Sequence, residues 1–316
     1  MKSVSLAAQA IACGAASVAV AGGMESMSRA PHLVRGLRGG LRLGGGALED
    51  SLLVDGLTCA VGRGGPHMGA LADAVATASK VTRAAMDAHA LESHARAAAA
   101  AAGARDADRA HGAEVVPVLA PPPLGARTGG KPTLIIDDDA PAKLAAARVP
   151  HLPPAFSPGG CITAATSSPV SDGAAALVLA SSTAAAAAGS RVLAHIVATA
   201  DAAVPPHLYP HAPAAAARRA LARAGLAVAD VDLWEINEAF SVVALVAAAE
   251  LGVDAARVNA AGGAVALGHP IGATGAALVA RLAHELAARG GRVGVAAICN
   301  GGGGATAVVL RRTPPE

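Results

Sequence analysis

The sequence is poor in aromatic residues. Only four occur among 316 residues, and they are Phe156, Tyr209, Trp234 and Phe240. A core with so few rings must be built from aliphatic side chains, each of which buries less apolar surface. The lack of aromatic residues interleaved with Lys and Arg also argues against a nucleic-acid-binding surface.

Long apolar runs and a strong net charge are missing as well. The segment 4–22 comes nearest to a membrane span, but Gln9, Gly14 and Ser17 interrupt it, and a span needs roughly 20 apolar residues. No cationic leader precedes this segment, so a signal peptide is not expected. The net charge of +2 implies no polyanionic partner.

The four cysteines form no CxxC pair and show no metal-ligand spacing. They are Cys13, Cys59, Cys161 and Cys299. Such usage is typical of a reducing compartment, where a special cysteine is kept for its reactivity.

What is present is a regular alternation of apolar strands and helices from about residue 191. The expected strands are 191–200, 231–236, 257–260, 292–298 and 305–311, and the expected helices are 213–224, 241–251 and 272–289. Buried strands that alternate with helices predict a layered α/β architecture.

The beginning of the chain repeats the order of its end. A helix at 3–13, a strand at 18–21 and a strand at 173–181 match the last helix and the last two strands, which indicates an internal duplication. The second copy has five expected strands and the first only two. Within the first copy, 28–158 is interrupted by Gly and Pro, with a helix expected at 70–103 and an extended piece at 133–136. We therefore expect one half with a loop domain over 1–181 and a second half over 182–316.

Three polar clusters in the last third of the chain carry candidate chemistry. His269 follows Gly268 and precedes Pro270 at the start of a helix, where a base or an oxyanion donor could face a cleft, although a capping role is also open. Cys299 ends an apolar strand before four glycines, as a presented thiol or an ordinary buried cysteine. Asn237 follows another strand and could orient a water or serve as a helix N-cap.

Together these segments resemble the thiolase family. The matching pieces are AGGMESMS (21–28), SDGAAALVL (171–179), WEINEAFSVV (234–243), GGAVALGHPIG (262–272) and AAICNGGGGA (296–305). The last of these and DAAVPP (201–206) are most similar to the short-chain, biosynthetic type that makes acetoacetyl-CoA from acetyl-CoA. The resemblance implies an α-β-α-β-α layered fold made from a duplicated half, here with the first half incomplete.

The resemblance also implies the roles of these residues in a two-step acyl transfer. A nucleophilic cysteine takes an acyl group from one CoA thioester, and the cysteine matching Cys299 removes an α-proton from acetyl-CoA. The histidine matching His269 activates the nucleophile and, with a water held by the asparagine matching Asn237, stabilises oxyanions. No redox cofactor is implied, and homodimers or homotetramers are the family's assemblies.

The sequence departs from the family pattern at the nucleophile. In the family this cysteine lies in a Cys-Ala/Gly-Ser-Gly motif directly before the helix that reads MKSVSLAAQAIACG here. Met1 falls just after that motif, and we assign the role to none of Cys13, Cys59 or Cys161, the last two of which we place in unrelated loops. We therefore expect an N-terminally truncated thiolase that is inactive alone.

Binding positions carry over in part. Positions that contact CoA in the family match His67, Met68, Arg148 and Ser168. In potassium-responsive members the ion is held by a tyrosine and by oxygens at positions that match Ala164, Ala165, Ser167 and Val265. The tyrosine position is His94 here, a departure that weakens the expectation of a potassium ion.

Two function classes stay open on the sequence alone. The first is an acyl-CoA C-acyltransferase that is active in a longer form, in a mitochondrial or cytoplasmic compartment. The second is a non-catalytic protein that binds acyl-CoA or dimerises with an intact thiolase. The presence of both His269 and Cys299 favours the first, because a binding protein has no use for a proton-abstracting thiol. A ketoacyl synthase is disfavoured, because those enzymes have no equivalent of Cys299.

Overall fold

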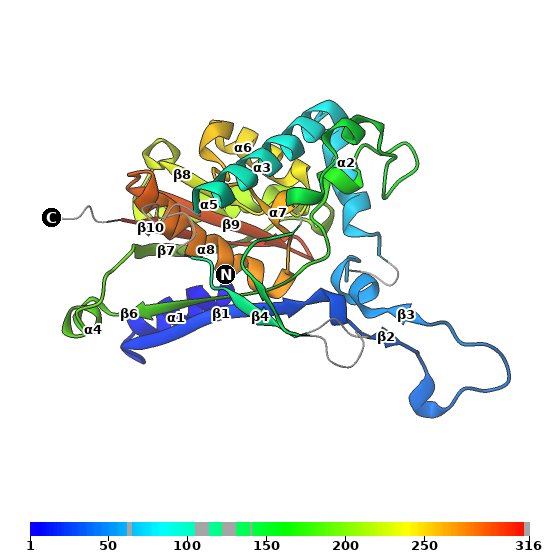
Figure 1. Cartoon of the computed structure of the whole chain (residues 1–316), viewed down its shortest axis with the longest axis horizontal. Helices are drawn as coiled ribbons and strands as arrows, with labels where there is room; N and C mark the ends of the chain where they lie inside the picture. The colour runs from blue at the N-terminus through cyan, green and yellow to red at the C-terminus, as the bar shows by residue number, and fades with distance from the viewer. Residues whose placement is uncertain (62–64, 105–113, 122–130, 140, 313–316) are drawn as a thin grey trace.

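The computed structural model describes residues 1–61, 65–104, 114–121, 131–139 and 141–312. Of the four sheets among the described residues, the two that form the core, β1-β6 and β7-β10-β9-β8, lie one above the other with helices between them, and further helices cover the outer face of the four-stranded sheet (Figure 1). The expected layered α/β architecture is therefore confirmed.

The smaller sheet consists of two long antiparallel strands, β1 (Val18–Ser26) and β6 (Asp172–Ala180). They pair without a break, from Val18 opposite Ala180 to Ser26 opposite Asp172. Both strands are longer or shifted relative to the sequence expectation, because the glycines of the AGGMES segment continue the ladder rather than ending it.

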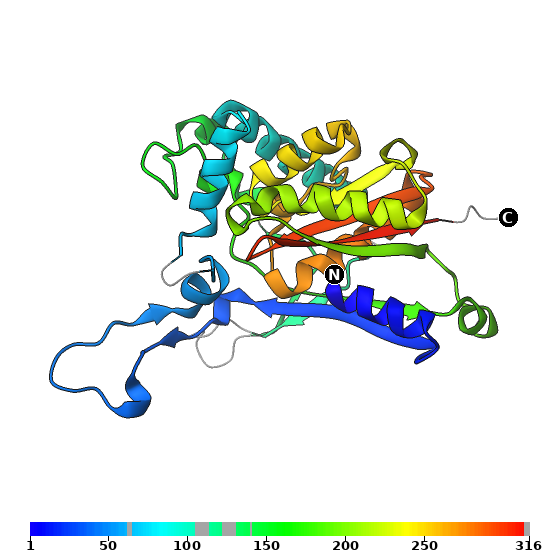
Figure 2. The same ribbon diagram turned by 180° about the vertical axis from the view of Figure 1, so that it is seen from behind.

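The larger sheet has the strand order β7-β10-β9-β8. The strands β8 and β9 run parallel, and the other neighbours are antiparallel. The bounds are β7 His195–Ala203, β8 Leu233–Ile236, β9 Val293–Asn300 and β10 Gly304–Arg311. Helices α5 (Ala212–Ala224) and α6 (Ser241–Leu251) cover its outer face, as Figure 2 shows from behind. Trp234 is 1% exposed in the alanine-rich core between them.

The central layer contains α1 (Lys2–Ala12) and α8 (Ile271–Ala288). Val4 of α1 and Leu282 of α8 belong to one buried cluster that also takes Leu179 from the small sheet and Val308 from the large one. The start of α1 presses so closely on α8 that a Cβ at Gly275 would lie 2.3 Å from the Met1 nitrogen.

The region between β1 and β6 contains two helices where the sequence predicted one. The expected helix 70–103 divides into α2 (Met68–Ala78) and α3 (Arg83–Ala104). Lys80 has a positive φ of 57°, which ends the first helix, and the Thr82 hydroxyl accepts from the Ala85 nitrogen at the start of the second. The remaining elements are β2 His32–Leu33, β3 Glu49–Asp50, β4 Val118–Ala120, β5 Thr133–Ile135, α4 Ser182–Ala187 and α7 Ala264–Leu267.

The strand expected at 257–260 is wrong. Only one bridge forms there, between Val258 and Trp234. Asn259 turns the chain with a φ of 50°, and its side chain takes over the pairing: Oδ1 accepts from the Ile236 nitrogen at 2.8 Å and Nδ2 donates to the Ile236 oxygen at 2.8 Å. A side chain thus replaces the backbone of a fifth strand.

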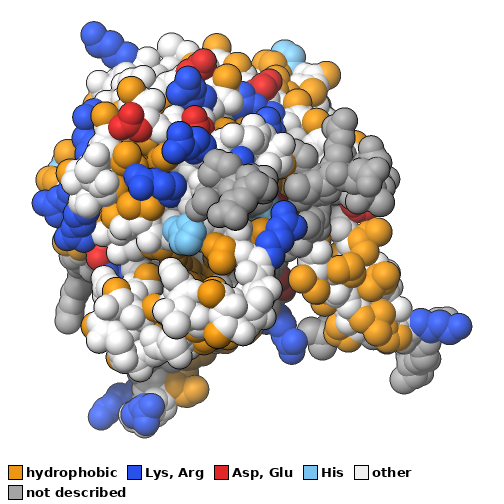
Figure 3. All heavy atoms as spheres, turned by 90° about the vertical axis from the view of Figure 1, so that its left-hand side faces the viewer, with side chains coloured by type: hydrophobic (Ala, Val, Ile, Leu, Met, Phe, Trp, Pro, Cys, Tyr) orange, Lys and Arg blue, Asp and Glu red, His pale blue; other side chains and the backbone are white. Residues whose placement is uncertain are grey.

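The helix–strand–strand order occurs twice, as the duplication predicts. Helix α1 precedes the antiparallel pair β1 and β6, and α8 precedes the antiparallel pair β9 and β10. Among the described helices, none is both long and apolar enough to span a bilayer. On the face shown in Figure 3, the coloured Lys and Arg side chains lie among acidic and neutral ones rather than in a stripe.

Candidate active site

Asn237 and His269 meet at the end of the large sheet. Asn237 directly follows β8, and its backbone nitrogen donates to the Ala297 oxygen of β9 at 3.0 Å. The Nδ2 of Asn237 lies 3.2 Å from Nε2 of His269, which precedes α8. The structure therefore brings together two of the three predicted catalytic residues in direct contact.

The neighbours of His269 fix its tautomer. The Thr274 hydroxyl donates its one proton to the Pro270 oxygen at 2.8 Å, so it must accept from Nδ1 of His269, 2.7 Å away. Nε2 then carries a lone pair that accepts from the Asn237 amide. Burial lowers the pKa of His269 to about 4, so the ring is neutral at physiological pH.

Cys299 lies on the strand next to Asn237. It comes two residues after Ala297 on β9, and because β8 and β9 are parallel, the two side chains occupy the same end of the sheet. The thiol is 8% exposed, and burial raises its pKa to about 12. Cys299 is therefore a neutral thiol in the resting protein and a strong base once deprotonated.

Glycines of both halves hold the Gly-His-Pro turn. A Cβ at Gly23 of β1 would lie 2.0 Å from the Gly272 oxygen, and one at Gly173 of β6 would lie 2.7 Å from Pro270. Gly268 has a φ of 95°, where other residues are strained. The small sheet thus supports the segment that carries His269, which explains why the AGGMES and SDG segments are glycine-bearing.

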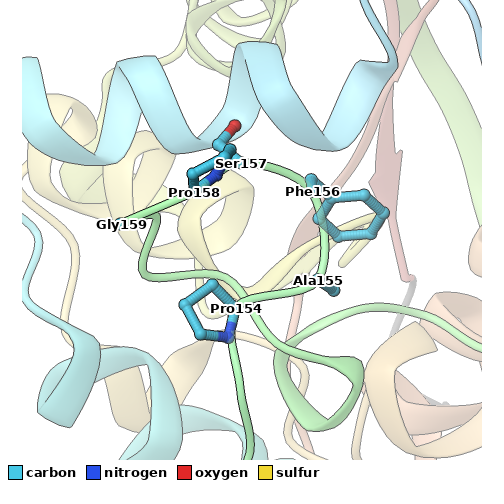
Figure 4. A pocket seen from close by; sticks show the side chains of 6 residues that line it. All are labelled: Pro154, Ala155, Phe156, Ser157, Pro158 and Gly159. Atoms are coloured by element: carbon cyan, nitrogen blue, oxygen red, sulfur yellow. The ribbon is translucent and has the colours of Figure 1, made fainter.

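The predicted CoA-binding residues His67 and Met68 lie at the start of α2. His67 caps this helix by accepting from the Gly69 nitrogen at 3.0 Å, and its ring stacks on Phe156 with centroids 4.7 Å apart. Met68 shares a buried cluster with Cys299. Figure 4 shows the Phe156 ring on one side of the 154–159 loop, which borders an open cavity of about 360 Å³.

The other two predicted CoA positions lie apart from each other. Ser168 stands beside the Asn237 segment, since its hydroxyl donates to the Ala239 oxygen at 3.0 Å. Arg148 is exposed on the short helix Ala146–His151 and is not drawn into this cluster by any described side-chain hydrogen bond.

Sequence reasoning missed two aromatic residues of this region. Tyr209 is 1% exposed, belongs to the Cys299 cluster, and donates from its hydroxyl to the Met68 oxygen at 3.1 Å. Phe156 packs edge-on against Phe240, with centroids 5.5 Å apart. The rarity of aromatic residues in the composition was the signal that could have found them, because three of the four lie in this region.

The placement of the other cysteines needs a correction. Cys59 is 5% exposed and belongs to the same buried cluster as Cys299, and Cys161 packs against that cluster. The sequence placed both in unrelated loops, because the fold of 28–158 onto α6 and β9 cannot be read from local pattern. Cys13 lies exposed at the end of α1, as expected.

The four predicted potassium positions line one cavity of about 190 Å³. Its lining is Ala164, Ala165, Ser167 and Val265 together with His94, Lys143, Leu144 and Pro169. The side chains offer hydrocarbon, one imidazole and one hydroxyl, whereas potassium sites in proteins are built from several oxygens. That hydroxyl, on Ser167, already donates to the Thr163 oxygen at 2.7 Å. The side chains alone therefore do not supply the oxygens of a potassium site.

Comparison with known proteins covers nearly the whole chain. The family model of the thiolase N-terminal domain matches residues 1–183, and that of the thiolase C-terminal domain matches residues 190–312. Acetyl-CoA acetyltransferase A, mitochondrial, of Xenopus laevis is 45% identical over 99% of this chain and 71% of its own length. The acetyl-CoA acetyltransferase of Escherichia coli is also 45% identical, over 99% of this chain and 76% of its own.

A solved structure agrees with these matches. The crystal structure of a thiolase from Ascaris suum in complex with coenzyme A superposes with a TM-score of 0.87 at 40% identity, over 99% of this chain and 76% of that one. The N-terminal domain model matches residues 1–183, so both thiolase domains are represented in the chain, which spans about three quarters of the length of these relatives.

Proposed function

The chain belongs to the thiolase family, and on this premise we propose that it condenses two acetyl-CoA to acetoacetyl-CoA and catalyses the reverse thiolysis. The observation that carries the proposal is the contact of Asn237 with a neutral His269 beside the buried thiol of Cys299. This geometry offers a base, a proton donor and an amide donor at one sheet end.

Cys299 is proposed to transfer the proton when the carbon–carbon bond is formed or cleaved. In the cleavage direction its neutral thiol gives a proton to the enolate carbon of the departing acetyl-CoA. In the synthetic direction its thiolate removes the same proton, and the carbanion attacks the thioester carbonyl and expels the thiol. A thiolate whose conjugate acid has a pKa of about 12 is a stronger base than an ordinary one, which suits a weakly acidic C–H.

His269 serves the thiol that receives the acyl group. Its Nε2 lone pair accepts a proton from that thiol, and the resulting N–H then donates to the oxyanion of the tetrahedral intermediate. The Oδ1 of Asn237 is buried and has no hydrogen-bond partner among the described residues, so it is free to accept from a water in the site.

The described surroundings of the cysteines other than Cys299 do not single one of them out as the thiol that receives the acyl group in the first half-reaction. Burial, and then the charge of Asp73, whose Oδ1 lies 3.6 Å from the sulfur, raise the pKa of Cys161 and oppose a thiolate there. Cys13 is exposed far along α1, and no basic side chain is bonded to Cys59 among the described contacts.

The pantetheine arm of CoA is proposed to lie along His67, Met68 and Ser168, between the Phe156 loop and the Asn237 segment. The likeness to a thiolase that binds coenzyme A supports this placement. Arg148, exposed at the edge, has a guanidinium suited to a CoA phosphate.

We propose a homodimer or homotetramer in a mitochondrial or cytoplasmic compartment. Relatives named as mitochondrial come from Xenopus laevis and Bos taurus, and bacterial relatives come from Pseudomonas aeruginosa and Escherichia coli.

The proposal is tested by exchange of the acetyl-CoA methyl protons in deuterated water. We expect exchange in the wild type and a reduction by about 10²–10⁴ in Cys299→Ala, the contribution typical of a general base. Cys161→Ala is the matched control, since Cys161 packs against the same cluster, and it should exchange normally. Equal exchange in Cys299→Ala would show that Cys299 is not the base. A wild type that binds acetyl-CoA without exchange would favour the non-catalytic binding protein.

A further inference from the structure

A buried carboxylate lies directly behind the Asn237–His269 pair. Glu238 is 1% exposed, and its two oxygens accept from three different segments. Oε1 accepts from Asn259 Nδ2 at 2.7 Å, and Oε2 accepts from the Ser93 hydroxyl at 2.8 Å and from the Val265 nitrogen at 3.2 Å. One side chain thus joins helix α3, the turn at 259 and the segment that leads to His269.

The segment leading to His269 packs tightly against the Glu238 carboxylate. The Gly263 nitrogen donates to the Ser93 hydroxyl at 2.9 Å, and a Cβ at Gly263 would lie 2.1 Å from the Glu238 carboxyl carbon. Val265, bonded to the same carboxylate, is only four residues before His269. The path from the carboxylate to the imidazole therefore runs through the single turn of α7 and Gly268.

The two neighbouring side chains at the end of β8 reach the same segment at different points. The Asn237 amide contacts the His269 ring, while Glu238 holds the backbone at Val265. The Asn259 amide joins Glu238 to the last residue of β8, because its Nδ2 also donates to the Ile236 oxygen. The positions of Asn237 and His269 are therefore both fixed relative to the same cluster of buried polar side chains.

We propose that Glu238, together with Ser93, is a positioning group that sets the distance between Asn237 and the Nε2 lone pair of His269. The inference rests on the function proposed above and adds a residue with no contact to the reacting atoms. A loss of this support should misplace the base rather than weaken the binding of CoA, because His67, Met68 and Ser168 have no described hydrogen bond to the carboxylate.

The test compares Glu238→Gln with Glu235→Gln. Glu235 lies three residues earlier, on β8, and is 2% exposed, so it is matched in burial, but it is not among the described hydrogen-bond partners of the 259–265 segment. We expect Glu238→Gln to slow acetyl-CoA proton exchange by about tenfold to a hundredfold, the penalty typical of a small misplacement. The KM for acetyl-CoA should stay unchanged, and Glu235→Gln should exchange at the wild-type rate.

A second readout separates positioning from a merely structural role. Nitrogen NMR of the His269 ring, assigned by difference from His269→Ala, reports the Nδ1–H tautomer and the hydrogen bond at Nε2. We expect Glu238→Gln to alter the Nε2 signal, and Glu235→Gln to leave it unchanged. Ser93→Ala, which keeps the carboxylate, should shift the Nε2 signal in the same direction. If Glu238→Gln does not fold, the Ser93→Ala signal tests the positioning role.

The outcomes keep the two proposals distinct. Wild-type exchange and an unchanged His269 signal in both Glu238→Gln and Ser93→Ala would overturn the positioning role. A wild type without exchange would overturn the proposed function, while the ring signal would still report whether Glu238 holds His269.

Discussion

The two sheets of this protein differ in how completely they are covered. The large sheet has four strands with helices on both faces, and its strands β9 and β10 are almost entirely buried. The small sheet has two strands, and its outer face exposes Val18, Val20, Met24 and Val178, which are 54%, 74%, 70% and 73% exposed. The inner face alone is packed, against α1 and α8.

The two sheets also have different roles: the large sheet carries candidate catalytic residues, and the small sheet supports the turn that carries His269. Asn237 and Cys299 lie at the carboxyl ends of two parallel strands of the covered sheet, where burial shifts the pKa of the thiol. The small sheet is not the source of these groups, but Gly23 and Gly173 press on the turn that carries His269. A two-stranded sheet can position a neighbouring loop without being covered itself, whereas a thiol whose pKa is shifted by burial must be shielded from water.

The largest expected effect concerns the pH dependence at the covered sheet. Because the pKa of Cys299 is about 12, the thiolate fraction should rise about tenfold for each pH unit below that value. Acetyl-CoA proton exchange should therefore climb steadily with pH, without a step from His269, whose pKa of about 4 keeps it neutral. Exchange rates measured between pH 6 and about 10 check this. A plateau of the exchange rate near neutral pH would mean that the Cys299 thiol is solvated rather than buried.

A comparison of core truncations tests the difference in cover directly. Leu282→Ala removes a side chain that is 0% exposed in the central layer, and it should lower the free energy of unfolding by about 2–5 kcal/mol. Val178→Ala on the open face should change it by less than about 0.5 kcal/mol. Urea denaturation of both variants gives the numbers. Equal losses would show that something covers the small sheet in solution.

Stability should also depend on pH through the covered sheet. Burial raises the pKa of Glu235 to about 8 from an ordinary 4.5, so its contribution is complete below pH 4.5 and is lost as the pH rises through 8. Glu235→Gln should remove this loss and raise the free energy of unfolding at pH 8 by about 1–3 kcal/mol. Thermal unfolding at acid and alkaline pH checks it, with Glu92→Gln, 60% exposed, as control.

The smallest effect on stability should come from charging the open face. Val20 and Val178 are directly opposite each other, so Val20→Lys with Val178→Glu places an ion pair between β1 and β6. The free energy of unfolding should change by less than about 1 kcal/mol. Self-association, followed by light scattering, should fall because an exposed apolar strand pair favours aggregation. Unchanged scattering would show that another surface drives association.

Much of the fold could be predicted where the apolar pattern is periodic. The helix at 241–251 was predicted with its observed bounds, and β9 and β10 within two residues, because buried strands and Gly-bounded helices leave local signals. The strand at 257–260 failed because Asn259 replaces backbone pairing with its side chain, which no period reveals. The break at Lys80 was missed because a positive φ there has no glycine to announce it.

The motifs alone were enough to indicate the family, the layered fold and Asn237, His269 and Cys299 as candidate catalytic residues, since these residues lie in long motifs of fixed order. The folded chain was needed to show that Cys59 lies in the cluster of Cys299 and that Glu238 and Ser93 hold the segment leading to His269. The folded chain also buries Cys299 and His269, which raises the pKa of Cys299 and lowers that of His269. A motif specifies which side chains follow one another along the chain, whereas desolvation and distance arise when segments far apart in the chain pack together.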